Sequence, residues 1–97
     1  MRGFVVVVRE HGRYVEGSPG QEHGRFDTFE EAEAACRRIV DASLEAHHRP
    51  GISADALFRH YTLWGDDPGV VCPPEAHARS FSSWTYAETR CRDLCRE

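Results

Sequence analysis

The stretch that decides the fold is FDTFEEAEAACRRIVDASL, residues 26–44. Thr28 stands three residues before Glu31, a spacing at which the two side chains satisfy free amides at a helix start. Apolar residues then recur at steps of three and four, namely Phe29, Ala32, Ala35, Cys36, Ile39, Val40 and Leu44. This pattern predicts a long helix with one buried face. The basic residues at 47–49 suit its carbonyl end, and the Pro-Gly pair at 50–51 stops it.

Ahead of this helix, the run FVVVV at residues 4–8 predicts a β-strand. A short Gly-containing link at 11–12 and the alternating residues 13–16 predict a second strand that closes an antiparallel hairpin. Residues 17–25, GSPGQEHGR, have the composition of a surface loop. Because the first strand is apolar on both faces, we expect both to be covered, by helices or by a second subunit.

Beyond the long helix, the cap Ser53 predicts a second helix that runs to about Tyr61. Residues 70–72 are expected to form a short strand or an extended segment, ended by two prolines. A cap at Ser82 or Ser83 begins a last helix, whose shared apolar face consists of Trp84, Ala87, Cys91, Leu94 and Cys95. The expected fold is a single α+β domain over 1–97, with a small antiparallel sheet of two or three strands packed with three helices.

Composition narrows the classes of function. The chain of 97 residues carries a net charge of −4, and its basic residues are arginines interleaved with acids, so nucleic-acid binding is disfavoured. The longest apolar run, residues 4–8, is far shorter than the roughly 20 residues that span a bilayer, and is too short for a secretory signal. We therefore expect a cytoplasmic protein without a membrane segment, whose four cysteines are reduced.

The segment GDDPG at 65–69 looks most like a site. Aspartate is favoured at turns, and Pro68 forces Asp67 into an extended conformation, so we expect a structural turn whose carboxylates accept amide hydrogen bonds. The alternative is a small enzyme or divalent-metal binder centred on His60, Asp66 and Asp67, with the histidine as general base. A divalent ion needs about six oxygen ligands, however, and this segment offers two carboxylate side chains.

The cysteines invite a metal hypothesis. Cys91 and Cys95 lie one helical turn apart, and Cys36 and Cys72 could complete four thiolates. The paired Cys-x-x-Cys motifs of structural zinc sites are absent, and three of the four thiols fall on predicted buried faces. We expect buried thiols with no metal and no cofactor.

Aromatic residues cluster at both ends of the proline-rich segment 68–74. Tyr61, Trp64, Phe81, Trp84 and Tyr86 either pack in the core or form a partner-binding patch, since Trp and Tyr are enriched at interface anchors. The favoured function is a small non-enzymatic cytoplasmic interaction or structural domain. Its expected partners are a second copy in a homodimer and an unidentified protein.

Three motifs in order, FDTFEEAEAACRRIVDASL, GISADALFRHYTLWGDDPGV and FSSWTYAETRC, resemble those of short uncharacterised bacterial proteins of unknown function. The shared features are a Thr-capped helix, a GDDP loop and an FSxWxYA helix start, over residues 4 to 95. This resemblance implies no catalytic residues. The joint at 26–32 is also similar to that of HicB-type antitoxins and of arm-type DNA-binding domains of tyrosine integrases, which implies an antitoxin-like or DNA-binding accessory domain as a minor alternative.

Overall fold

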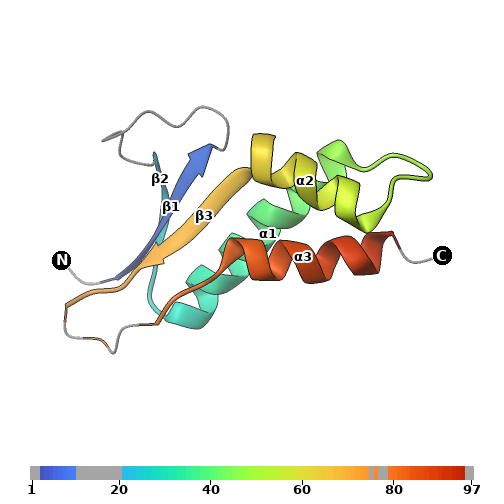
Figure 1. Cartoon of the computed structure of the whole chain (residues 1–97). Helices are drawn as coiled ribbons and strands as arrows, with labels where there is room; N and C mark the ends of the chain where they lie inside the picture. The colour runs from blue at the N-terminus through green and yellow to red at the C-terminus, as the bar shows by residue number, and fades with distance from the viewer. Residues whose placement is uncertain (1–2, 11–20, 75, 77–78, 96–97) are drawn as a thin grey trace.

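The computed structural model describes residues 3–10, 21–74, 76 and 79–95. In chain order the elements are β1 (Phe4–Glu10), β2 (Gln21–Phe26), α1 (Phe29–His47), α2 (Ala54–Trp64), β3 (Asp66–Val71) and α3 (Ser83–Leu94). The strands form an antiparallel sheet in the order β2-β1-β3. The first half of helix α1 lies across one face of the sheet. Helices α2 and α3 pack together against the second half of α1 (Figure 1). The expected α+β fold, with three helices and a small antiparallel sheet, is confirmed.

Alternation along β1 separates the two faces of the sheet. Val6 is fully buried against α1, and its neighbours in the sheet are Gly24 of β2 and Val70 of β3. Because successive side chains of a strand point to opposite faces, Val5 and Val7 lie on the face that looks away from α1. We call this second surface the open sheet face.

The buried residues fall into two groups along α1. The sheet cluster consists of Val6, Ala32, Ala35 and Cys36. The helix cluster consists of Val40, Leu44, Leu57, Tyr61, Ala87 and Cys91. The half-buried ring of Phe81, just before α3, packs against both clusters. One helix therefore supplies its first half to the sheet and its second half to a three-helix core.

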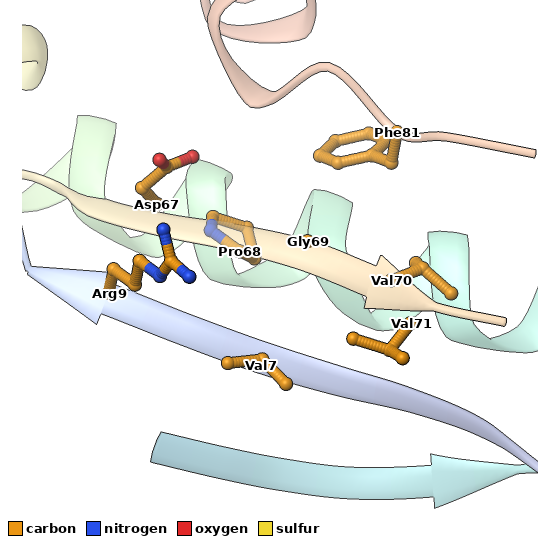
Figure 2. Close-up of a pocket in the computed structure, with 8 residues that line it drawn as sticks. All are labelled: Val7, Arg9, Asp67, Pro68, Gly69, Val70, Val71 and Phe81. Atoms are coloured by element: carbon orange, nitrogen blue, oxygen red, sulfur yellow. The ribbon is translucent and has the colours of Figure 1, made fainter. Parts of the chain in front are cut away.

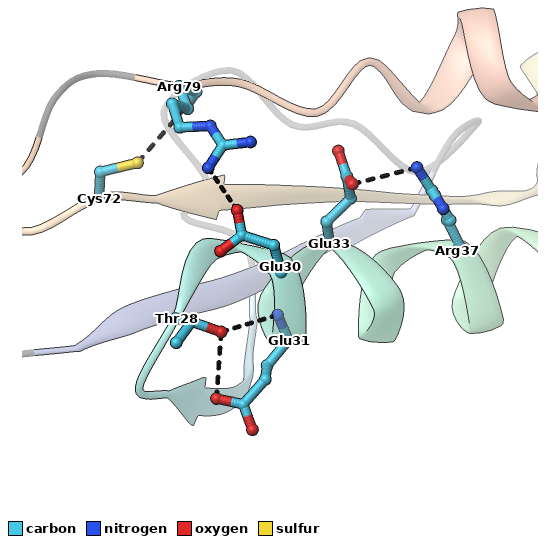
Figure 3. Close-up of polar contacts among 7 residues, drawn as sticks. All are labelled: Thr28, Glu30, Glu31, Glu33, Arg37, Cys72 and Arg79. Atoms are coloured by element: carbon cyan, nitrogen blue, oxygen red, sulfur yellow. Dashed lines mark hydrogen bonds and ion pairs between the residues drawn. The ribbon is translucent and has the colours of Figure 1, made fainter.

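The expected caps are in place. The Thr28 hydroxyl accepts the amide of Glu31 at 3.1 Å and donates to its carboxylate at 3.1 Å, which completes the capping box (Figure 3). Ser53 caps α2 by accepting an amide at 3.1 Å, and Ser82 caps α3 at 3.3 Å. Helix α2 ends at Trp64 rather than near Tyr61.

Two sequence-based predictions about the strands are wrong. Residues 21–25, expected in a loop, belong to β2, because β1 offers a partner for their backbone groups although β2 contains no β-branched residue. The GDDPG segment is not a turn, because Asp66 to Gly69 belong to β3. Pro68 faces Val8 within this edge strand, where a missing amide is tolerated. The strand predicted over 13–16 lies outside the described residues.

The segment between β3 and α3 is tied back to α1. The Arg79 guanidinium forms an ion pair with the Glu30 carboxylate at 2.5 Å, and the Cys72 thiol donates to the Arg79 carbonyl at 3.4 Å (Figure 3). The same guanidinium lies 4.2 Å from the centre of the Phe29 ring, a cation–π contact. In the described part of the chain, no helix combines the length and hydropathy that a membrane span requires.

Candidate functional site

The junction between α2 and β3 is built around Gly65. Its amide donates to the Tyr61 carbonyl at 2.9 Å and so closes the last turn of α2. A Cβ atom at position 65 would lie 2.8 Å from that same oxygen and would also collide with the Tyr61 ring. Only glycine fits here, so the first residue of the GDDPG segment is explained by packing alone.

Asp66 is held through its backbone. Its amide donates to the Ser43 hydroxyl of α1 at 3.0 Å, and its carbonyl accepts the Tyr61 hydroxyl of α2 at 2.7 Å. Burial raises the pKa of Tyr61, with the Ser83 hydroxyl acting in the opposite direction, so the phenol stays a neutral donor. Two helices thereby fix the start of β3.

Asp67 contributes its side chain instead. The carboxylate accepts a hydrogen bond from the hydroxyl of Ser83, a buried residue at the start of α3. A carboxylate acceptor helps to offset the hydration that this buried hydroxyl loses on folding. Asp66 and Asp67 thus join β3 to three helices through hydrogen bonds with hydroxyl groups. That their carboxylates also accept amide hydrogen bonds stays a prediction.

His60 lies on α2 with an exposed side chain, and its ring stacks on that of His47 in α1, with centroids 5.9 Å apart. The carboxylate of Asp67, by contrast, is directed to Ser83. Within the residues that the structure describes, no group of three or more His, Cys, Asp or Glu side chains could hold a metal ion. The geometry therefore gives the three candidate residues separate surroundings rather than a common catalytic centre.

The four thiols are also dispersed. All four cysteines are free, with Cys36 in the sheet cluster and Cys91 in the helix cluster. Burial raises the pKa of Cys36 to about 11, with Glu33 and Asp67 adding to the effect. Burial likewise raises the pKa of Cys91 to about 11, assisted by Cys95. These two thiols are packed and protonated at neutral pH, which suits neither nucleophilic chemistry nor metal binding.

A groove that sequence reasoning missed lies along β3, at the edge of the open sheet face. It has a volume of about 300 Å³ and is lined by Val7, Arg9, Asp67, Pro68, Gly69, Val70, Val71 and Phe81. Figure 2 shows Gly69 on β3 between Val7 on one side and Phe81 on the other. A Cβ atom at position 69 would meet no atom within 4 Å, so the missing side chain leaves the hollow open. The only sequence signal for this groove is that Gly69 pairs with an apolar residue of β1, and this signal can be recognised only once the strand pairing is known.

Val71 stands beside this hollow. It is 57% exposed, and it occupies the same side of β3 as Gly69, two residues away. Val5 and Val7 on β1 are half-buried. Helix α1 contacts all three strands, and it does so on the face opposite to the open sheet face. Among the described residues, the open sheet face thus carries an apolar strip of Val5, Val7 and Val71, in which Val71 protrudes and Gly69 leaves a hollow, with the exposed Arg9 beside it.

The five aromatic candidates do not form one patch. Tyr61 is fully buried and offers no surface to a partner, whereas Trp64 is 61% exposed and Trp84 is 49% exposed. Trp84 contacts Phe58 edge to face, with ring centroids 6.2 Å apart. The half-buried rings of Phe81 and Tyr86 contact each other, with centroids 5.8 Å apart.

Comparison of the chain with protein-family models, curated proteins and solved structures finds no match. The resemblance to short bacterial proteins therefore stays an expectation from the motifs.

Proposed function

We propose that the protein is a small, non-enzymatic cytoplasmic interaction domain that binds a protein partner on its open sheet face. The observation that carries this proposal is the exposure of Val71 next to the hollow at Gly69. Leaving a valine in water forfeits about 1.5 kcal/mol relative to full burial. A partner that covered Val71 would recover the share of that free energy that belongs to its exposed 57%, and the hollow would receive one of the partner's side chains.

The polar candidates lend more support to this function than to the enzyme alternative. Asp67 and the backbone of Asp66 hold β3 to the helices, and His60 stacks on another histidine. The four free thiols are compatible with the reducing cytoplasm that this proposal assumes. The net charge of −4 gives the antitoxin-like or DNA-binding alternative no electrostatic support. A homodimer and a complex with another protein would both use the open sheet face.

The test is site-specific photo-crosslinking in the native cell. A photoreactive amino acid replaces Val71 on the open sheet face or, as the matched control, Arg38, which is exposed on α1. We expect a discrete protein adduct from position 71 and none from position 38. Equal adducts from both positions, or none from position 71, would contradict a binding role for this face.

A further inference from the structure

We infer that the partner on the open sheet face is a second copy of this chain, related by a twofold axis that seats Val71 of each copy over Gly69 of the other. This inference rests on the proposed function and identifies the partner that binds the open sheet face. A twofold contact brings one surface onto itself, so each position that protrudes must meet a hollow on the same surface. Val71 and Gly69 provide such a pair, since one is 57% exposed and the other leaves space above the strand.

The register of the sheet locates the axis. Val71 lies opposite Val5 of β1, and Gly69 lies opposite Val7. These two cross-strand pairs define two levels along the strands. A twofold axis that lies in the plane of the interface, runs perpendicular to the strands and passes halfway between the two levels exchanges one level with the other. It places Val71 over Gly69 of the second copy, and it also places Val5 over Val7. The central strand therefore contributes apolar contacts at both levels.

The third strand provides an independent check on the same axis. Arg25 of β2 pairs with Val5, and Glu22 pairs with Val7. A register shift in β2 between these two pairs lets residues three apart share one face of the sheet. The two side chains are exposed and form an ion pair 3.2 Å long within one chain, which agrees with a shared position on the open sheet face. The axis that exchanges the levels of Val5 and Val7 places Arg25 over Glu22 of the second copy, and the reverse. The same twofold rotation thus places the protruding Val71 over the hollow at Gly69 on β3, and it places opposite charges over each other on β2.

The charges also make the open sheet face a better place for two copies to meet than the rest of the surface. The chain has a net charge of −4, so two copies repel each other on average. On β2, the described Arg25 and Glu22 of the open sheet face have opposite charges that cancel. Two sheets packed in this way would lie face to face with their strands roughly antiparallel, an arrangement typical of aligned sheet packing.

Charge reversal tests the inference by analytical ultracentrifugation of the whole chain from about 1 to about 500 µM. We expect the parent to approach twice the chain mass of 11.0 kDa. Arg25→Glu alone and Glu22→Arg alone should each raise the dimer Kd at least about tenfold, because like charges then face each other. An equimolar mixture of the two variants, and the double variant, should both regain the dimer mass. An ion pair that acts only within one chain cannot restore association on mixing.

Val71→Glu serves as a second variant, because its exposed position tolerates a polar side chain in the monomer. It should remain at the chain mass while keeping the circular dichroism spectrum of the parent. A parent that stays at the chain mass throughout, or single reversals that associate like the parent, would overturn the inference. Crosslinking from position 71 separates the two proposals: an adduct with another protein refutes only the second-copy inference, whereas no adduct refutes the binding surface as well.

Discussion

At the scale of single residues, two glycines of one segment have opposite steric surroundings. A Cβ atom at Gly65 would lie 2.8 Å from the Tyr61 carbonyl, whereas one at Gly69 would meet nothing within 4 Å. We expect Gly65→Ala to lower the free energy of unfolding by about 2 kcal/mol or more, because overpacking must displace backbone. Gly69→Ala is the matched control and should be neutral or stabilising for the monomer, measured at a protein concentration below the dimer Kd so that no partner side chain occupies the hollow. Urea denaturation measures both, and equal losses would refute the steric argument.

The two aspartates also differ in what their side chains do. Asp67→Ala leaves the buried Ser83 hydroxyl without its carboxylate acceptor and should cost about 1 to 3 kcal/mol of stability. Asp66→Ala should cost less than about 0.5 kcal/mol, because Asp66 is held through its amide and carbonyl. Chemical denaturation of both variants provides the measurement. A larger loss from Asp66→Ala would show that its carboxylate has a role that these contacts do not explain.

The buried thiols give a prediction that depends on pH. Cys36 and Cys91 have pKa values raised from 9.0 to about 11 by burial, so the folded protein favours the protonated form. Their contribution to stability is complete below pH 9.0 and is lost as the pH rises through about 11. At pH 8 a disulfide reagent should modify the half-buried Cys72 and Cys95 first, and Cys36 and Cys91 only as the protein unfolds. Equal rates for all four, followed by mass spectrometry, would contradict the packing of these thiols.

At the scale of secondary structure, α3 is docked on α1 by one shared carboxylate. Asp41 of α1 accepts hydrogen bonds from the Tyr86 hydroxyl at 3.0 and 3.1 Å and from the Arg90 guanidinium at 3.0 Å. Asp41→Ala should therefore destabilise the protein by about 1 to 2 kcal/mol. Asp93→Ala is the control, because Asp93 also pairs with Arg90 but at 3.5 Å and with greater exposure, and should cost under about 0.5 kcal/mol. Thermal unfolding compares them, and equal costs would argue against the docking role.

The helices were predictable because their signals are local. Thr28, Ser53 and Ser82 each place a side-chain oxygen three residues before the amide that it accepts, and apolar residues at helical spacing supply the buried faces. The strands at the sheet edges were not predictable in this way. β2 and the start of β3 are rich in residues typical of loops, and they are extended because both pair with the apolar strand β1.

The candidate surface was predictable only in part for the same reason. The apolar character of Val5 and Val7 indicated a face that needs a cover, and that expectation leads to the open sheet face. The hollow at Gly69 and the position of Val71 beside it depend on the register between β1 and β3. Register is a tertiary property, so neither residue could be recognised as part of a surface from the sequence.

At the scale of the whole molecule, the two core clusters are joined through α1 and through the ring of Phe81, which packs on both. Phe81→Ala should therefore weaken the sheet and the helical end together, at a cost of about 2 to 3 kcal/mol for a half-buried ring. Phe4→Ala is the matched control. Phe4 is also half-buried, but it packs on the sheet cluster and not on the helix cluster.

Hydrogen exchange distinguishes the two variants, because amides that open in one cooperative unit share one opening free energy. After Phe81→Ala, the opening free energy of the amides in α2 and α3 should fall as much as that of the amides in β1. After Phe4→Ala, the opening free energy of β1 should fall by more than that of α3. If both variants instead lowered only the protection of β1, the helical end would be stable without Phe81, and the two clusters would be coupled by α1 alone.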